Sequence, residues 1–483
     1  MSAEFSRNQT PQGRCPGPLS RRTWLTVGGL SFASLFTGRL PSLPELLAGE
    51  ESDEFRAAND DFSVILFWAN GGPSHLDMFD LKPQAPVEYR GPFRPIQTNV
   101  PGVEIADTLP NLARMADKFA IVRSLHHTRS EHSGGTNRMV TGYESVAANP
   151  IDSEFPEVGA VVARHVAHQT KDLPLYVANT RIYGGGPAYL GPAYNAYMPN
   201  ANPVTASGAN QYDPVPIYTT GSENGTLSIS QQAASRLRRR AELLRSFDTL
   251  RRDTDRTGRM DAVDRFNQQA VEMLASARTR DAFDISQESE ATRKKYGETH
   301  WGRSLLTCRR LVESGVRFVQ CQATFRLKPE TGRTTTWDDH SVNADIFKAY
   351  EEKLPVFDQA VPALISDLYE RGLDRKVLFV FCGEFGRTPK IANQDKSGRP
   401  GRDHWPRAFS NIWAGGGIQT GAVIGATDKR GEDVVERPCG PHDYLATIYH
   451  HLGIDYQKTT IDDFNGRPTH IVNNGKAIPE LIA

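Results

Sequence analysis

The chain has 483 residues, a hydrophobic content of 38% and a formal net charge of -1. A chain this close to neutral is not expected to bind nucleic acid or another polyanion over a broad surface. Its five cysteines show no CxxC spacing and no dense framework, which argues against a small domain held together by disulfides.

The N-terminal stretch 1–50 has the pattern of an export signal followed by a linker. The pair Arg21-Arg22 precedes an uncharged apolar stretch, 27–36, that is too short to span a membrane stably. Paired arginines in this setting are typical of the twin-arginine route, which carries folded proteins. The other interpretation is a chance pair beside a short core helix. We expect the twin-arginine export machinery as a partner, delivery to the periplasm or cell envelope, and no stable membrane span after signal removal.

Continuous apolar runs that end in loop signals predict the strands. The clearest run, 62–69 (FSVILFWA), ends in Asn-Gly-Gly-Pro, as expected for a strand buried on both faces. Further strands are expected at 119–123, 173–178, 316–322, 376–382 and 409–414. Helices are expected at 109–118, 155–168, 341–371 and 442–452, the third of them interrupted by Pro355 and Pro362.

Two segments depart from this alternation. Residues 182–226 are rich in Gly, Pro, Asn and Tyr and predict a long ordered loop over the core. Residues 228–315 predict a helical insertion, whose arginines form either the solvated face of an amphipathic helix or a basic patch. The sequence thus predicts a single α/β domain over 51–483, with a mostly parallel central sheet, helices on both faces and this insertion.

Acidic and imidazole side chains follow several of the expected strands. Because reacting groups in open α/β sheets gather at the carboxyl ends of strands, these side chains are expected to converge. Imidazole with carboxylate suits zinc, iron or manganese, whereas carboxylate alone suits magnesium or calcium. The candidate ligands for a divalent metal are Asp77, His132, Asp338, His340, Glu384, Asp403 and His404.

Each candidate also has a structural interpretation. Some of the thirteen histidines are expected to serve the fold alone. Asp338 or its neighbour could cap the following helix, and Glu384 could pair with Arg387. Arg387 and Arg402 could clamp an oxyanion bidentately or simply neutralise the acids.

Several motifs resemble known families. The pattern Leu109-Pro110-Asn111, followed by His132 through Thr141-Gly142, resembles the N-terminal pattern of sulfatases and places their nucleophile slot at His132, with Ser133 beside it. Glu384 falls where their later metal motif has an Asp. Over roughly 60–480 the chain more closely resembles an exported bacterial family classed as a 1501-type domain of unknown function. The matching motifs lie at 71–83, 337–340, 383–389, 401–405, 414–417 and 425–428.

The second family is placed in the alkaline phosphatase and sulfatase superfamily, so the resemblance implies that fold. It implies a metal-dependent hydrolase of sulfate or phosphate esters, acting on a small-molecule or glycan ester. The divalent metal would be zinc, calcium, manganese or iron, with Ser133 or metal-activated water attacking and Arg387 and Arg402 stabilising the oxyanion. Asn70 replaces the superfamily's first metal-binding Asp, and the nucleophile motif lacks its Cys, Pro and Arg. A catalytically inactive relative that binds a glycan or another envelope component, and an assembly factor acting through the insertion, remain alternatives.

Overall fold

The computed structural model describes residues 61–166, 172–200, 215–220, 276–393 and 398–482. The expected signal and linker at 1–50 and most of the expected insertion, 228–275, lie outside these residues. Within the described residues, no helix has both the length and the apolar character needed to cross a membrane.

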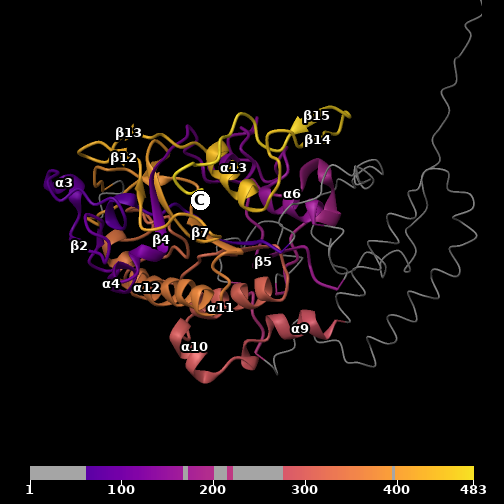
Figure 1. The fold of residues 1–483 in the computed structure, drawn as a ribbon. Helices are drawn as coiled ribbons and strands as arrows, with labels where there is room; N and C mark the ends of the chain where they lie inside the picture. Colours follow the sequence, from indigo (N-terminus) through magenta and orange to yellow (C-terminus); the bar gives the residue numbers. More distant parts are fainter. Residues whose placement is uncertain (1–60, 167–171, 201–214, 221–275, 394–397, 483) are drawn as a thin grey trace, which may run out of the picture.

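The described residues form a seven-stranded central sheet in the order β11-β4-β10-β7-β1-β6-β5 (Figure 1). Its strands are β1 (Ser63–Trp68), β4 (Phe119–Leu125), β5 (Tyr176–Ala178), β6 (Phe318–Gln322), β7 (Val377–Cys382), β10 (Phe409–Gly415) and β11 (Val423–Ile424). β10 runs antiparallel to both of its neighbours, and the other pairs are parallel. The predicted mostly parallel sheet is confirmed.

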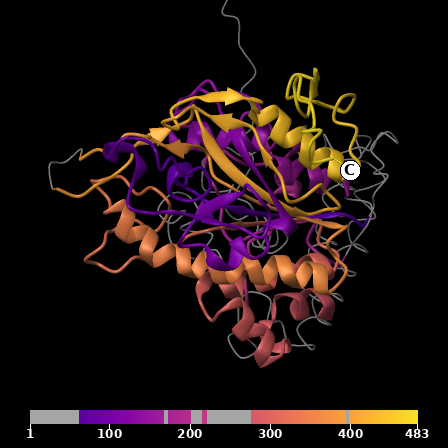
Figure 2. The same cartoon turned by 60° about the vertical axis from the view of Figure 1, so that its left-hand side comes forward.

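Both faces of the sheet are covered, as the continuous apolar character of β1 predicts. Ile65 and Phe67 face a core shared with α4 (Pro110–Ala113), α11 (His300–Glu313) and α12 (Ile346–Glu370). Val64 and Trp68 face a second core shared with α5 (His132–Thr141), α6 (Val158–His165) and α13 (Pro441–His451). Figure 2 shows the first layer below the sheet and α13 above it.

The long helix α12 differs from its prediction. It runs unbroken from Ile346 to Glu370 through Pro355 and Pro362, although each proline removes one backbone hydrogen bond. Its apolar side, including Leu354 and Phe357, is fully buried against the sheet. Tertiary packing of this face stabilises the helix enough to offset the local cost.

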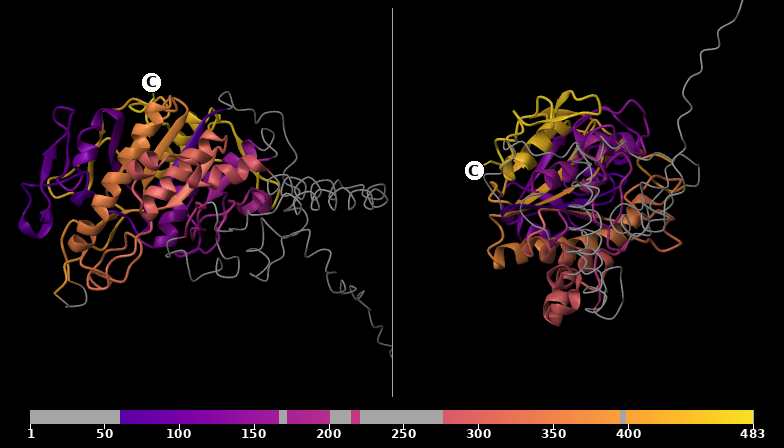
Figure 3. Two further views of the ribbon diagram at one scale, coloured as in Figure 1. Left: turned by 90° about the horizontal axis from the view of Figure 1, so that it is seen from below. Right: turned by 90° about the vertical axis from the view of Figure 1, so that its right-hand side faces the viewer.

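The described end of the expected insertion contains α9 (Ala277–Phe283), α10 (Glu290–Tyr296) and α11. α11 packs directly on β1, β6 and α12, so it belongs to the helical layer of the sheet. Seen from below in Figure 3, α11 and α12 lie side by side across the sheet.

Short elements complete the fold at its edges. The expected helix at 109–118 is split into α4 and a 3-10 turn at Ala116–Lys118. The remaining helix and strands are α3 (Val87–Arg90), β2 (Pro95–Gln97), β3 (Glu104–Ala106), β8 (Gly386–Arg387), β9 (His404–Trp405), β12 (Ala426–Thr427), β13 (Val434–Glu436), β14 (Thr460–Asp462) and β15 (Pro468–His470).

The topology brings several loops to one edge of the sheet. The parallel strands β1, β4, β6 and β7 all end there, and the antiparallel strand β10 begins there. The loops that follow the first four strands therefore meet the segment that precedes β10.

Candidate metal centre

Three of the expected ligands, from three segments far apart in the sequence, meet at this edge. They are His132 at the start of α5, Asp338 in the loop after β6, and His404 in β9. One ligand atom from each lies within 4.8 Å of the other two. The two imidazole Nε2 atoms stand 3.3 and 3.0 Å from Asp338 Oδ1. Two ligands at 2.0–2.2 Å from one tetrahedral ion stand about 3.3–3.6 Å apart, so each imidazole nitrogen lies close to the spacing from Asp338 Oδ1 that a shared divalent ion requires.

Both histidines are oriented through their other ring nitrogen. His132 Nδ1 lies 2.7 Å from Glu384 Oε1, and His404 Nδ1 lies 2.7 Å from the carbonyl oxygen of Ser130. A carboxylate and a carbonyl can only accept, so each Nδ1 must carry a hydrogen to make its bond. Both Nε2 atoms then face Asp338. This is the arrangement in which proteins hold histidine ligands ready for a metal.

Asp338 contacts several side chains of the centre through its two carboxylate oxygens. Its Oδ1 also accepts from the Arg387 guanidinium at 2.8 Å, and its Oδ2 lies 3.0 Å from His340 Nε2 and 2.9 Å from Asn343 Nδ2. Burial opposes its charge, but Arg387 and the three imidazoles outweigh burial and hold the pKa of Asp338 well below its usual range. The Asp338 carboxylate is therefore ionised at neutral pH.

The two histidines differ in charge state when no metal competes. Burial opposes protonation of His132, but its hydrogen bonds to Asp338 and Glu384 are stronger and raise its pKa to about 9. Burial instead lowers the pKa of His404. A metal ion binding at neutral pH must displace the proton from His132 Nε2.

Glycines allow the loops to approach this closely. A Cβ at Gly135 would come within 3.1 Å of the Phe385 ring and 3.3 Å of Glu384 Cβ, so glycine lets the first turn of α5 sit on the loop after β7. Gly71 has φ +105, and a Cβ there would collide with the backbone nitrogen of Asp338. The loop after β1 thus passes directly beneath the ligand.

Among the described residues, Arg387 contacts the clustered ligands through Asp338. Its side chain is fully buried. It donates to the carbonyl oxygens of Gly72 at 2.9 Å and Arg402 at 3.1 Å, and also to that of Gly71. Because its donors are used inside the protein, this arginine holds Asp338 and the loop after β1 in place.

Asp77 and Arg402 pair with each other. Asp77 Oδ2 lies 2.8 Å from Arg402 Nε, and both side chains are fully buried. Ser74 Oγ donates to Asp77 at 2.5 Å, and Arg402 Nη2 donates to the Tyr89 carbonyl at 2.6 Å. In the described structure neither forms a hydrogen bond or ion pair with the three clustered ligands.

The other expected residues lie close by in sequence but make no such contacts. Asp403 is half-buried and pairs through its backbone with Thr388. Ser133 is half-buried in the first turn of α5, with Gly184 packed against its carbonyl oxygen. Within the described residues, neither side chain is hydrogen-bonded to the cluster. His340, as noted, contacts the second oxygen of Asp338.

Sequence reasoning missed Asn343 and the Ser130 carbonyl. Asn343 donates to Asp338, and it lies three residues after His340, just beyond the motif at 337–340. A backbone carbonyl carries no residue-specific signal, so the contact of Ser130 with His404 was not predictable from residue types.

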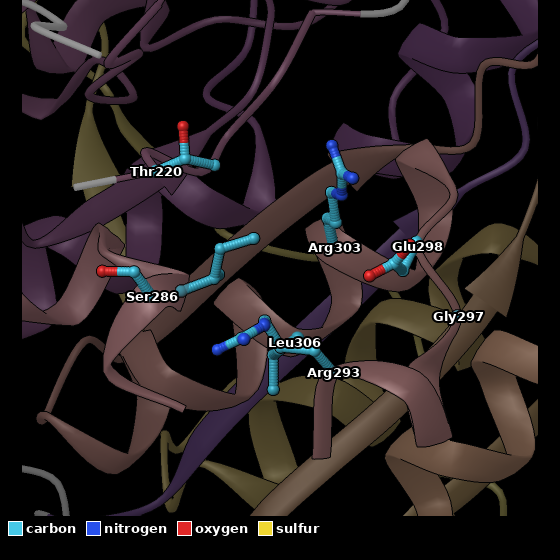
Figure 4. Close-up of a pocket in the computed structure, with 8 residues that line it drawn as sticks. Thr220, Ser286, Arg293, Gly297, Glu298, Arg303 and Leu306 are labelled. Carbon is cyan, nitrogen blue, oxygen red and sulfur yellow. The ribbon is translucent and has the colours of Figure 1, made fainter. Parts of the chain in front are cut away.

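A separate cavity of about 270 Å³ lies in the helical layer, away from this centre. Figure 4 shows its walls, which include Arg293 of α10, Arg303 and Leu306 of α11, and Ser286. None of the clustered ligands lines it, so it is distinct from the metal centre.

Comparison with known families gives one extended match. The model of a family described as "Protein of unknown function (DUF1501)" matches residues 61–482. The chain belongs to this family. The assignment made from the motifs is thereby confirmed. A search of curated proteins finds no match.

Several solved structures are distantly similar to this chain. The PsFucS1 sulfatase from Pseudoalteromonas sp. is similar at 11% identity and a TM-score of 0.38, with 92% of this chain and 74% of that chain covered. The lipoteichoic acid synthase LtaP from Listeria monocytogenes is similar at 11% identity and a TM-score of 0.33, covering 88% and 80%. A TAB5 alkaline phosphatase variant with magnesium bound is similar at 9% identity and a TM-score of 0.33, covering 83% and 100%. These likenesses are too distant to transfer residue roles, which must come from the geometry above.

Proposed function

We propose that this DUF1501 protein is an exported, metal-dependent hydrolase of sulfate or phosphate esters. The observation that carries the proposal is the meeting of His132, Asp338 and His404, with both imidazoles held by their Nδ1 atoms so that Nε2 faces the carboxylate. Three protein ligands and a remaining open position are the usual composition of a catalytic site for such an ion. Two imidazoles and one carboxylate favour zinc, iron or manganese over calcium or magnesium.

Each residue of the centre would have a separate role in this function. His132 and His404 would bind the ion, Asp338 would supply the negative charge, and Arg387 keeps that carboxylate ionised and in place. His340 lies on the other oxygen of Asp338 and is the next imidazole within reach. A divalent ion held there would act as a Lewis acid that polarises the ester oxygens and stabilises developing charge.

A second candidate function has its own support. Arg387 and Arg402 are fully buried and donate to protein groups, and the Ser133 hydroxyl makes no hydrogen bond to the cluster within the described residues. A protein that holds a metal but lacks an oxyanion clamp and a poised nucleophile would bind a glycan or another envelope component without turning it over.

Metal content and turnover distinguish the two functions. The purified chain is loaded with zinc, manganese or iron, analysed for bound metal, and assayed with aryl sulfates and aryl phosphates. Stoichiometric metal with turnover that Asp338→Asn abolishes supports the hydrolase, and stoichiometric metal without turnover supports the binder. His450→Ala, on the exposed end of α13, is the matched control and should change neither quantity. A folded chain that binds none of these metals and turns over none of these esters contradicts the hydrolase and favours the binder.

Export through the twin-arginine machinery is part of the same proposal. It is supported by Arg21-Arg22 and the short apolar stretch that follows. Replacing both arginines with lysine should retain the protein in the cytoplasm, as read by cell fractionation. Unchanged delivery to the periplasm or envelope would contradict this route.

A further inference from the structure

We propose that Glu384 is a positioning residue of the metal centre, which acts through His132 and does not itself bind the ion. The inference rests on the metal site of the proposed function. It reassigns a carboxylate that the sequence pattern placed among the ligands.

The two nitrogens of the His132 ring have different neighbours. Nδ1 lies 2.7 Å from Glu384 Oε1, whereas Nε2 lies 3.3 Å from Asp338 Oδ1. The two nitrogens sit at different edges of an imidazole. An ion bound at Nε2 with Asp338 and His404 therefore has the ring between itself and Glu384 Oε1.

Glu384 is held rigidly by the ends of three strands. It lies two residues after the end of β7, its Oε1 accepts from the Gly71 backbone N–H at 2.7 Å, and its carbonyl oxygen lies 2.5 Å from His127 Nε2. His127 Nδ1 accepts from the Arg129 backbone N–H, which leaves the hydrogen of this ring on Nε2 for the bond to Glu384. The carboxylate thus has a fixed place before any metal arrives.

The carboxylate is fully buried, and within the described structure its Oε2 has no hydrogen-bond partner. Burying a charged group with an unsatisfied oxygen costs free energy. The two hydrogen bonds to Oε1, from the Gly71 backbone N–H and from His132 Nδ1, offset part of that cost. The contact with His132 is made by Oε1, which ties this oxygen of Glu384 to the Nδ1 side of the ring.

A carboxylate at Nδ1 does two things that a neutral acceptor does less well. It fixes the ring orientation, and it makes Nε2 a more basic and stronger ligand. His404 receives only the Ser130 carbonyl at its Nδ1. The influence of Glu384 on metal binding should consequently pass through His132 alone.

A double-mutant cycle on zinc affinity tests this. The dissociation constant for zinc is measured by chelator competition for the unsubstituted chain, Glu384→Gln, His132→Ala and the double variant. Glu384→Gln should weaken zinc binding by about 10–100-fold in the unsubstituted chain. In the His132→Ala background, which keeps Asp338 and His404, it should change affinity by no more than about twofold. Losses that multiply in the double variant would show that Glu384 binds the ion directly and would overturn the proposal.

The control is another buried carboxylate of the same domain. Glu157, at the start of α6, is buried and forms no hydrogen bond or ion pair with the three ligands in the described structure. Glu157→Gln should leave zinc affinity unchanged. A loss as large as that of Glu384→Gln would mean that any buried charge change disturbs the site, and would also count against positioning.

A second readout works without metal. With ¹⁵N-labelled histidine, the Nδ1–H proton of His132 in the metal-free chain should resonate at low field and move upfield in Glu384→Gln. An unchanged resonance overturns the proposal whether or not zinc binds.

If the unsubstituted chain binds no zinc, the metal site of the proposed function fails, and the resonance alone decides the role of Glu384. If zinc binds and the cycle is non-additive but no ester is turned over, the hydrolase fails and the positioning role stands.

Discussion

Removing Lys353 should destabilise the fold in a way that depends on pH. Lys353 Nζ lies 2.7 Å from each carboxylate oxygen of Asp339 and 2.6 Å from the Thr336 carbonyl oxygen, and both charged side chains are fully buried. Asp339 is the neighbour of Asp338, so this pair also fixes the loop that carries the proposed ligand. Lys353→Met keeps an unbranched side chain about as long as the lysine's aliphatic part and leaves Asp339 buried without its cation.

The loss in the free energy of unfolding can be worked out from the protonation of Asp339 in the variant. Burial raises the pKa of Asp339 even beside Lys353, so without the lysine it takes up a proton. Bringing an aspartate from its unfolded pKa of 3.9 to neutrality at pH 7 costs about 4 kcal/mol, at 1.36 kcal/mol per unit. The same step costs about 1.5 kcal/mol at pH 5. An acid whose folded pKa is raised destabilises the fold above its unfolded pKa, so the loss grows as the pH rises.

Urea unfolding followed by circular dichroism measures this difference between variant and unsubstituted chain at pH 7 and pH 5. Adding Asp339→Asn to Lys353→Met should recover most of the loss at pH 7, because no charge then remains buried. A loss below about 1 kcal/mol, as for an exposed ion pair, or a loss that is equal at both pH values, would refute the reasoning.

Further predictions concern the metal and the core. His404→Ala and His340→Ala should each lower bound metal in elemental analysis, and full occupancy in both variants would remove these residues from the site. Gly71→Ala should also lower metal content, because the added Cβ collides with the nitrogen of Asp338; unchanged content would mean that the loop adjusts. Burial lowers the pKa of His451 to about 4, so the unfolded chain binds its proton more tightly and stability falls as the pH drops from about 6.5 to 4, by up to ~3 kcal/mol. His451→Gln should flatten this pH dependence in urea unfolding, whereas the exposed neighbour His450→Gln should not; equal slopes in both variants would contradict the assignment.

The strands were predictable because their signal is local. The runs at 62–69 and 376–382 are continuously apolar and correspond to β1 and β7, which are buried on both faces. Helix α12 shows the limit of local rules. Pro355 and Pro362 predict interruptions of the helix. A local sequence pattern does not report the free energy gained when the buried face of α12 packs on the sheet.

The position of the site was predictable in the same coarse way. Parallel strands share a carboxyl edge, so polar residues after them meet there. The partner of each side chain was not predictable. Asp77 obeys the same rule as Asp338, yet its carboxylate meets Arg402, which lies 325 positions away in sequence. Both acids receive a buried guanidinium, but Asp338 also meets three imidazoles, and only the packing of the loops decides this difference.

One short loop organises all three proposed ligands without being required to supply any of them. In the segment that follows β7, Glu384 accepts the Nδ1 hydrogen of His132, and Arg387 donates to Asp338. The backbone of Arg387 pairs with that of His404 in the β8–β9 ladder, and the Phe385 ring stacks on the His404 imidazole at 4.5 Å between centroids. Because a centre works only when its ligands are held by a rigid surrounding shell, the chemistry of this site depends on the 383–387 loop as much as on the residues that face the ion.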